Sequence, residues 1–588
     1  MSNSQPDKGK QGMVKLFFHA STVDFEKIPG KPIAYWLSEG VRDAFSTFPP
    51  LREISVPRQG NTTTNNARFV RAWYEVTKNG IGLCCASAKE FNGKRLKWAP
   101  YNKGGGSRSW YGQNESVVNW KDNGAEIKAI PHSVIANESS YFSPGITWST
   151  ISTSGIGFRF FGSGFIFDNK GACIFVSGTT QRKLAALLNS KVFEQVLYQI
   201  NPTVSLQPGD VAKFPIVSET RIHEESVLRN SDSCIHIARF DWDSYETSWD
   251  FISPPLLRPD HRQPTLKASY QSLRAHWREM TLEMQRLEQE NNRIFIDAYG
   301  LQDELTPDVP LNEITLTCNP HYRYGGDKSD EELEAMLLAD TMRELVSYAV
   351  GCMLGRYSLD KPGLILANQG ETLADYLAQV PQPSFPADDD NVIPVLDGDW
   401  FADDITLRFR QFLRVAFGEA HYEDNLAFIE QALNVKGKRN YSLRDYFLSE
   451  FYADHVKRYK KRPIYWLFSS PKGSFNALIY MHRYRPDTVS VVLKYLRDYR
   501  EKLSTEKERQ ASVSINPATS QGDKTRALKE VERLSKVLAE LEDYERDVLY
   551  PLATEQKAID LDDGVKVNYL KFGAALKKIT GLDAKEED

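Results

Sequence analysis

The sequence has few cysteines and no long apolar segment. Its 588 residues include six cysteines, none of them in a C-x-x-C pair, so neither a zinc ribbon nor a disulfide framework is indicated. Cys234 and Cys318 each have a histidine nearby, but two such pairs far apart in sequence make a weak case for zinc. No apolar stretch approaches the roughly 18 residues of a membrane helix, and the polar start, 1–11, lacks the apolar core of a signal peptide. We therefore expect a cytoplasmic protein with no membrane span, no metal site and reduced thiols.

Several common catalytic motifs are also missing. G-x-x-x-x-G-K-[ST], G-x-S-x-G and H-E-x-x-H do not occur, so nucleotide hydrolysis and the usual hydrolase chemistries have no support. Aromatic residues make up 12% and charged residues 26% of the chain. This composition excludes a disordered chain, and the length provides for about three to five packed domains.

Charge is unevenly distributed along the chain. Residues 1–217 carry 25 Lys and Arg against 15 Asp and Glu, whereas the remainder carries 48 against 63. A basic first third joined to an acidic remainder indicates that one part binds a polyanion. Chance variation of solvated surfaces explains the same numbers about as well.

The pattern of apolar residues predicts an α+β protein. Up to about residue 217, short aromatic strands alternate with Gly, Ser and Asn turns, with one helix expected near 180–199. A heptad seam over 270–294, with Asn291 as its polar position, predicts a long helix. Two further seams, 492–503 and 527–548, predict an antiparallel helical hairpin. The expected domains are the end of a preceding domain (1–40), a strand-rich domain (41–220), a long-helix spacer (221–385) and a mostly helical C-terminal domain (386–588).

Two short motifs resemble parts of an adenine methyltransferase. Residues 160–164 (FFGSG) fit the F-x-G-x-G loop that binds S-adenosylmethionine (SAM), and 319–322 (NPHY) approximate the N-P-P-Y that holds a flipped adenine. A cofactor loop should follow a strand and open a helix. Here the glycines stand between two aromatic strands, which predicts a hairpin, and His321 replaces the second proline. We therefore assign no catalytic residue.

An acidic cluster lies in the Pro-rich connection that follows residue 379. Its members are Asp388, Asp389, Asp390, Asp397, Asp399, Asp403 and Asp404. A nuclease centre would pair such carboxylates with a lysine on strands, and no lysine is present here. We interpret the cluster as a solvated linker.

Basic and amide side chains interleaved with aromatics are the better candidates for nucleic-acid binding. Arginine and lysine contact phosphates or guanine, and asparagine reads adenine. The candidates are Arg58, Arg68, Arg71, Lys97, Tyr101, Asn102, Lys103 and Arg108. Of these, the residues that flank the flexible 104–106 glycine loop are the first choice. The spacing of Arg68 and Arg71 leaves open whether they share a face, since that depends on strand or helix.

A second basic cluster lies in the C-terminal part. It consists of Lys457, Arg458, Lys460, Lys461 and Arg462. These residues are candidates for phosphate contact, for a protein contact or for a solvated helix face.

Together, a set of segments resembles the PglX family, the adenine-specific DNA methyltransferases of BREX phage-defence systems. It is also similar to single-chain restriction–modification enzymes with a fused recognition domain. The segments include 28–36 (IPGKPIAYW), 66–75 (NARFVRAWYE), 97–104 (KWAPYNKG), 164–168 (GFIFD), 201–216, 240–249 (FDWDSYETSW), 317–325 (TCNPHYRYG) and 462–468 (RPIYWLF).

This resemblance implies a target recognition domain that binds double-stranded DNA. Family members carry a catalytic domain ahead of it, with the SAM loop and a true N-P-P-Y, and the sequence has neither. We therefore expect the C-terminal half of such an enzyme, as an excised fragment or a natural split subunit, with no cofactor in this chain and SAM in the complete enzyme.

The alternative function is a protein-interaction scaffold. The acidic remainder and the heptad seams favour docking of a methyltransferase half, another BREX component or a phage-encoded inhibitor. Salt-sensitive duplex binding favours the recognition module, and co-elution with a protein partner favours the scaffold.

Overall fold

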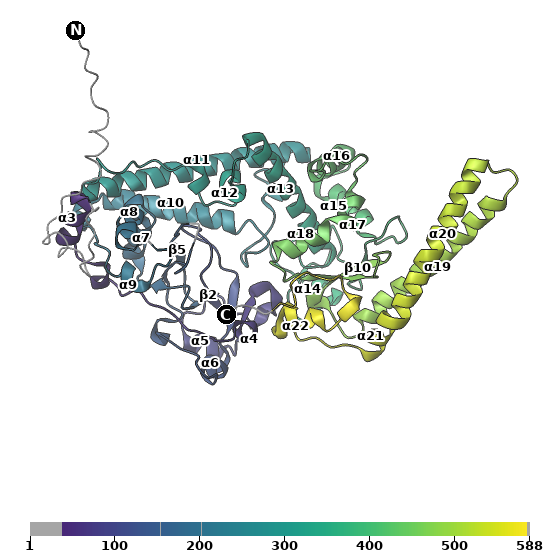
Figure 1. Ribbon diagram of the computed structural model, residues 1–588, viewed down its shortest axis with the longest axis horizontal. Helices are drawn as coiled ribbons and strands as arrows, with labels where there is room; N and C mark the ends of the chain where they lie inside the picture. Colours follow the sequence, from purple (N-terminus) through teal and green to yellow (C-terminus); the bar gives the residue numbers. More distant parts are fainter. Residues whose placement is uncertain (1–37, 153–154, 202, 585–588) are drawn as a thin grey trace, which may run out of the picture.

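The computed structural model describes residues 38–152, 155–201 and 203–584. Most of the expected 1–40 segment, including the 28–36 motif, lies outside these residues. The predicted α+β class is confirmed, with small sheets in the first region and long helices beyond it (Figure 1). The domain boundaries stay predictions.

The first region is built on two small sheets. One has the order β1-β3-β2-β6, with β2 and β6 parallel, and the other has the order β5-β4-β7. The strands are β1 (Val70–Ala72), β2 (Trp98–Asn102), β3 (Ser116–Asn119), β4 (Gly145–Thr147), β5 (Arg159–Phe161), β6 (Ile166–Phe167) and β7 (Cys173–Ile174). The aromatic residues of this region mostly form its core, and four of its tryptophans are fully buried: Trp98, Trp110, Trp120 and Trp148.

The predicted hairpin around residues 160–164 is wrong. β5 and β6 flank these glycines but belong to different sheets, because β5 pairs with β4 whereas β6 pairs with β2. Gly164 has a φ of +104°, and a Cβ atom there would lie 3.0 Å from the backbone nitrogen of Cys84. The glycine therefore lets the chain cross between two sheets, an arrangement that local sequence does not specify.

Among the described residues, seven short helices precede, separate or follow the strands of the first region. The single helix expected near 180–199 is two helices, because Asn189 leaves the helical conformation and Ser190 caps a new one, its Oγ accepting from the backbone N–H of Phe193 at 3.4 Å. The helices are α3 (Glu39–Thr47), α4 (Asn66–Phe69), α5 (Ala88–Gly93), α6 (Lys121–Lys128), α7 (Gly178–Leu188), α8 (Lys191–Ile200) and α9 (Pro208–Val211).

The predicted heptad helix is α11 (Leu266–Tyr299), which runs along one side of the molecule from α3 towards the C-terminal helices (Figure 1). Its seam residues are buried against α8, α10 (Glu224–Trp242) and α16 (Tyr422–Leu433). The polar seam residue Asn291 donates from Nδ2 to the carbonyl of Ala186 at 2.8 Å. This hydrogen bond fixes the register of α11 on the first region.

The C-terminal part surrounds a three-stranded sheet of order β8-β10-β9. Its strands are β8 (Ile393–Pro394), β9 (Tyr465–Ser469) and β10 (Asn476–Tyr480). The remaining helices are α12 (Pro320–Tyr324), α13 (Asp330–Met353), α14 (Leu373–Gln379), α15 (Ile405–Phe417), α17 (Leu443–Ser449), α18 (Phe451–Arg458), α21 (Tyr550–Glu555) and α22 (Gly564–Leu570).

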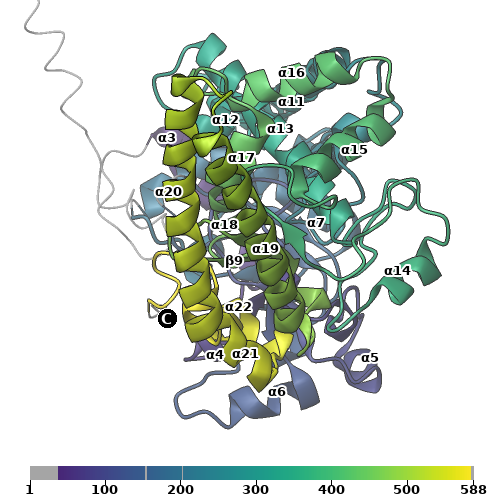
Figure 2. The same cartoon turned by 90° about the vertical axis from the view of Figure 1, so that its right-hand side faces the viewer.

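The predicted antiparallel hairpin is formed by α19 (Thr488–Ile515) and α20 (Gln521–Tyr544). Leu503 and Leu534 are buried between the two helices. The hairpin projects from the body in Figure 1, and its helices lie side by side in Figure 2. Apolar residues Ile515 and Leu528 are exposed near its tip, at 80% and 58%.

The acidic cluster is solvated only in part, because Asp388 and Asp404 are buried whereas Asp389, Asp390, Asp397 and Asp399 are exposed. The carboxylate of Asp388 is buried and accepts from the backbone N–H of Val392 at 3.1 Å, and Asp404 caps α15 by accepting from Thr406 N at 2.9 Å. Burial and the neighbouring Asp390 raise the pKa of Asp388 to about 7. The sequence pattern could not show that Asp388 lies against distant residues: its backbone N–H donates to Met353 O at 2.7 Å, and its carbonyl accepts from Arg483 Nη1 at 2.9 Å.

Candidate nucleic-acid interface

A cleft of about 770 Å³ lies between the first region and the C-terminal part. One wall carries Lys103, Lys170 and the 104–106 glycine loop, and the other wall carries Lys460 and Arg462. Two members of each predicted basic cluster therefore line one cleft, although the clusters are separated by more than 300 residues in sequence: Arg71 and Lys103 from the first, Lys460 and Arg462 from the second. Arg71 and the amide-bearing Asn66 and Gln113 also line the cleft, as do the carboxylates of Glu75 and Glu115.

The glycine loop shapes one wall of the cleft. Gly104, Gly105 and Gly106 all have positive φ, at +79°, +101° and +66°. A Cβ atom on Gly104 would lie only 2.4 Å from the carbonyl oxygen of Lys170. Glycine is thus required at 104 both for conformation and for close approach, and this approach brings Lys103 and Lys170 together.

The opposite wall follows directly from the end of α18. Lys460 and Lys461 both adopt left-handed conformations, with φ of +50° and +61°, so the helix ends and the chain turns into β9. Lys460 forms an ion pair with Glu115 across the cleft, and Arg462 Nε lies 3.6 Å from Glu75 Oε1. The cations of one region are therefore balanced in the free protein by carboxylates of the other.

Arg71 joins the first region to the C-terminal tail. Its guanidinium donates to the carbonyls of Asp562 at 3.3 Å, Asp563 at 3.0 Å and Ala67 at 2.7 Å. The side chain is 9% exposed, so it lines the cleft chiefly as a structural element. Arg68 and Arg71 do not share a face, because α4 ends and β1 begins between them. Arg68 faces outward and pairs with Glu126.

Three of the predicted DNA-contacting residues are buried and contact other parts of the protein. Arg108 is 3% exposed and pairs with Asp241 at 2.7 Å. The hydroxyl of Tyr101 is buried 2.7 Å from Asp168 Oδ2, and burial raises the pKa of Tyr101. Asn102 is also buried. Of the residues that flank the glycine loop, the structure therefore leaves Lys103 facing the cleft.

The other candidates lie outside the cleft. Arg58 Nη1 donates to Asn137 Oδ1 at 2.6 Å, and Lys97 pairs with Asp562 at 2.8 Å. In the second basic cluster, Lys457 and Lys461 are exposed, whereas Arg458 turns inward to within 4.0 Å of Glu246. Sequence reasoning missed Lys170, Gln113 and the partner carboxylates; the turn sequence 168–171 (DNKG) was the available signal for Lys170.

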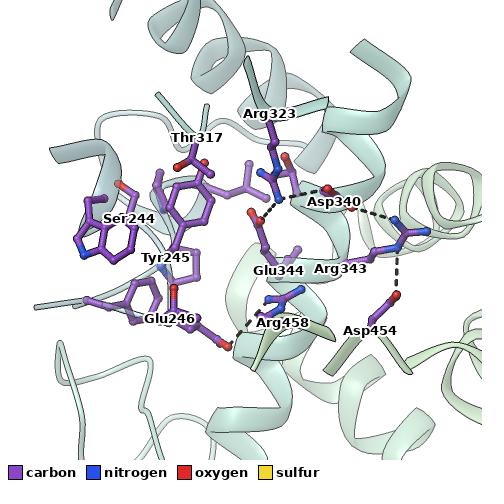
Figure 3. Close-up of a pocket in the computed structure, with 18 of the residues that line it drawn as sticks. Ser244, Tyr245, Glu246, Thr317, Arg323, Asp340, Arg343, Glu344, Asp454 and Arg458 are labelled. Atoms are coloured by element: carbon purple, nitrogen blue, oxygen red, sulfur yellow. Dashed lines mark hydrogen bonds and ion pairs between the residues drawn. The ribbon is translucent and has the colours of Figure 1, made fainter. Parts of the chain in front are cut away.

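A smaller pocket of about 340 Å³ adjoins the cleft and shares Glu115 and Lys460 with it. Figure 3 shows its charged side chains pointing toward one another. Arg323 contacts Glu344 at 2.9 Å and Asp340 at 3.2 Å. The pKa of Asp340 lies below its usual value. Burial alone would raise it, but the charge of Arg323 and the hydrogen bonds from Tyr324 and Arg343 stabilise the carboxylate more strongly.

The network continues across the pocket and ties the spacer to α18. Arg343 bridges Asp340 at 2.9 Å and Asp454 at 3.2 Å (Figure 3). Burial raises the pKa of Glu246, which faces Arg458. Because these charges are mutually paired, the pocket braces the interface between helices and holds the basic end of α18 against the cleft.

The NPHY motif has a structural role. Asn319 is fully buried, and its side chain caps α12 by accepting from His321 N at 3.2 Å. Its Nδ2 donates to the carbonyls of Leu311 at 2.7 Å and Ile314 at 2.9 Å. The carboxamide that would hold an adenine is thus committed to the local backbone. Within the described part of the chain, no group of three His, Cys, Asp or Glu side chains is placed to bind a metal.

None of the described helices is long and apolar enough to cross a membrane. No family model matches the chain.

Two curated proteins align with nearly its whole length. The chain is 36% identical over 580 residues to the adenine-specific methyltransferase BrxX of Escherichia coli O9:H4 (strain HS), and 34% identical over 584 residues to the adenine-specific methyltransferase PglX of Lacticaseibacillus casei (strain Zhang). These alignments cover 95% and 96% of the chain but 46% of each relative. The chain thus spans about half the length of these relatives, and over that span it is PglX-like.

Proposed function

We propose that this chain is the DNA-binding and site-recognising part of an adenine-specific methyltransferase of the PglX type, acting in phage defence. The cleft carries the proposal: Lys103 and Lys170 on one wall face Lys460 and Arg462 on the other. The basic charge of residues 1–217 supports it. Duplex DNA is the polyanion that an adenine-specific DNA methyltransferase engages.

The contacts across the cleft define how DNA would enter. In the free protein Lys460 pairs with Glu115 and Arg462 lies beside Glu75. DNA phosphates would replace these carboxylates as the partners of the two cations. The Gln113 side chain lines the cleft beside the glycine loop, and its amide is of the type that reads adenine in the major groove.

Methyl transfer is assigned by this proposal to residues outside the chain. The FFGSG glycines cross between sheets and Asn319 caps α12, so neither motif serves SAM chemistry here. In the complete enzyme SAM would supply the methyl group for adenine N6. Calorimetry should detect no SAM binding by the 588-residue chain alone.

Salt-dependent duplex binding tests the proposal. The observed binding constant should fall steeply with salt, since each phosphate contact contributes a slope of about −0.9. Lys103→Glu with Lys170→Glu should reduce that slope by about two. The matched control is Lys89→Glu with Lys121→Glu, two exposed lysines of the same region outside the cleft. Absence of duplex binding by the unaltered chain would refute the proposal.

A protein-docking role is the second candidate, favoured by the α19–α20 hairpin. The hairpin projects from the body and exposes Ile515 and Leu528 near its tip. Candidate partners are the methyltransferase half, other BREX components and a phage-encoded inhibitor. Replacing 505–531 by a short Gly-Ser turn removes both exposed residues, and it should abolish co-elution with such a partner while leaving duplex binding intact.

A further inference from the structure

A second basic concavity lies beside the cleft, within the C-terminal part. This groove, of about 790 Å³, runs between α17, α18, the β9–β10 turn and the tail segment 577–580. Six lysines line it and no acidic residue does: Lys457, Lys460, Lys461, Lys472, Lys577 and Lys578. The surrounding part of the chain is net acidic, so this lysine groove is a local departure from its setting.

The fold places these lysines together from three separate segments. Lys577 N donates to the carbonyl of Leu467 at 2.8 Å, which fixes the tail alongside β9. The β9–β10 turn is held by Glu540, whose carboxylate accepts from the backbone N–H of Lys472 at 2.7 Å. The left-handed turn at Lys460 and Lys461 supplies the third segment.

The ammonium groups of the lysine groove are mostly uncompensated. Within the residues that the structure describes, Lys457, Lys461, Lys472, Lys577 and Lys578 form no ion pair. Five cations without counter-charges repel one another and attract a polyanion. Lys460 differs, because it pairs with Glu115.

The groove has an exposed charged rim above apolar residues that are mostly buried. Phe447, Leu467 and Ile579 line it but are only 3%, 8% and 8% exposed. Leu448, at 38% exposed, gives the α17 end of the groove some accessible apolar surface, such as an amphipathic helix would use. The lysines line the groove from three separate segments, with no acidic residue among them. A phosphate backbone, which is met by charge alone, fits better.

The lysine groove is continuous with the cleft. Lys460 lines both, and Lys461 and Lys457 stand next to it on the groove side. A polyanion leaving the cleft past Lys460 would therefore meet the groove lysines next.

We infer that the lysine groove binds the phosphate backbone of the DNA that flanks the recognised site, extending the footprint from the cleft onto the C-terminal part. The inference rests on the proposed function and adds to it a second, sequence-independent contact surface. Lys460 acts as the shared contact between the two surfaces.

The test uses the 588-residue chain and a series of duplexes from about 10 to about 40 base pairs. The groove variant is Lys472→Glu, Lys577→Glu and Lys578→Glu, three exposed lysines. The matched control is Lys494→Glu, Lys507→Glu and Lys529→Glu on α19 and α20, outside the groove. A third variant, Lys472→Arg with Lys577→Arg and Lys578→Arg, keeps the charge. Circular dichroism melting confirms that each variant folds.

For the unaltered chain, affinity and salt slope should rise with duplex length and then level off. The groove variant should lose this gain with length, and its salt slope on long duplexes should be smaller by about three. The arginine variant and the hairpin control should behave as the unaltered chain.

Two results would overturn the inference, and they differ. If the unaltered chain binds duplexes and the groove variant matches it at every length, the groove does not contact DNA while the proposed function stands; loss of polyglutamate binding in that variant would identify an acidic protein as the occupant. If the unaltered chain binds no duplex, the proposed function fails and takes the inference with it.

Discussion

Arg108 provides the sharpest test of how the first region is built. Its guanidinium donates to Asp241 Oδ2 at 2.7 Å, Tyr111 O at 2.7 Å, Ala238 O at 2.9 Å and Thr317 Oγ1 at 2.9 Å. These partners come from the glycine-loop segment, α10 and the segment before α12. Arg108 therefore joins the first region to the spacer from within the core, although it lies two residues beyond the flexible glycine loop.

Arg108→Ala should destabilise the protein strongly. The change leaves the Asp241 carboxylate, 2% exposed, without its cation and strands three further acceptors. Breaking a buried pair by removing one partner costs about 3–5 kcal/mol. Asp241 keeps the backbone donors Thr317 N at 2.8 Å and Cys318 N at 2.9 Å, which places the cost toward the lower end.

Thermal unfolding followed by circular dichroism measures the effect. At about 2–4 °C per kcal/mol for a cooperative unit of about 150–250 residues, the melting temperature should fall by about 6–12 °C. Arg68→Ala is the matched control, because its ion pair with Glu126 is half exposed and contributes about 0–1 kcal/mol. Arg108→Met with Asp241→Asn should recover part of the loss. An unchanged melting temperature combined with weaker duplex binding would refute this reasoning and return Arg108 to the DNA-contacting set.

Three further outcomes follow from the structure. Gly104→Ala should destabilise the loop by about 1–3 kcal/mol, because φ is +79° and the new methyl group would meet Lys170 O, and limited proteolysis should cut the loop faster. Burial raises the folded pKa of Asp388 above its unfolded value, to about 7, so the folded state holds the proton more tightly and stability falls as pH rises from about 4 to 7; Asp388→Asn should flatten that part of a stability–pH curve, and an unchanged curve would contradict the assignment. Asn319→Ala should cost about 1–3 kcal/mol in denaturant unfolding through the lost cap and hydrogen bonds, whereas equal stability would reopen a functional role for this motif.

The sequence by itself determined the elements whose packing is periodic. The seam of α11 and those of the α19–α20 hairpin are visible because apolar residues recur at helical spacing. The register role of Asn291 followed from its place in the seam, and its hydrogen bond to Ala186 agrees. The PglX-like character was also readable, because it resides in local motifs spread along the whole chain.

Only the tertiary structure decided which cations face the cleft. Lys103 and Arg108 are five residues apart, yet Lys103 lines the cleft and Arg108 is buried. Between them three glycines adopt positive φ, so neither strand nor helix period assigns a face. The sequence could rank the segment as a whole but not its individual side chains.

Contacts between residues far apart in sequence also could not be predicted from local sequence. Lys460 pairs with Glu115 and Arg71 reaches the backbone of Asp563, contacts that depend on α18, β9 and the tail folding back onto the first region. Asp388 was misread for the same reason: burial by distant elements, not the acidic run itself, sets its environment. Periodicity encodes which face of an element is buried, whereas the partner that buries it is fixed only when the whole chain packs.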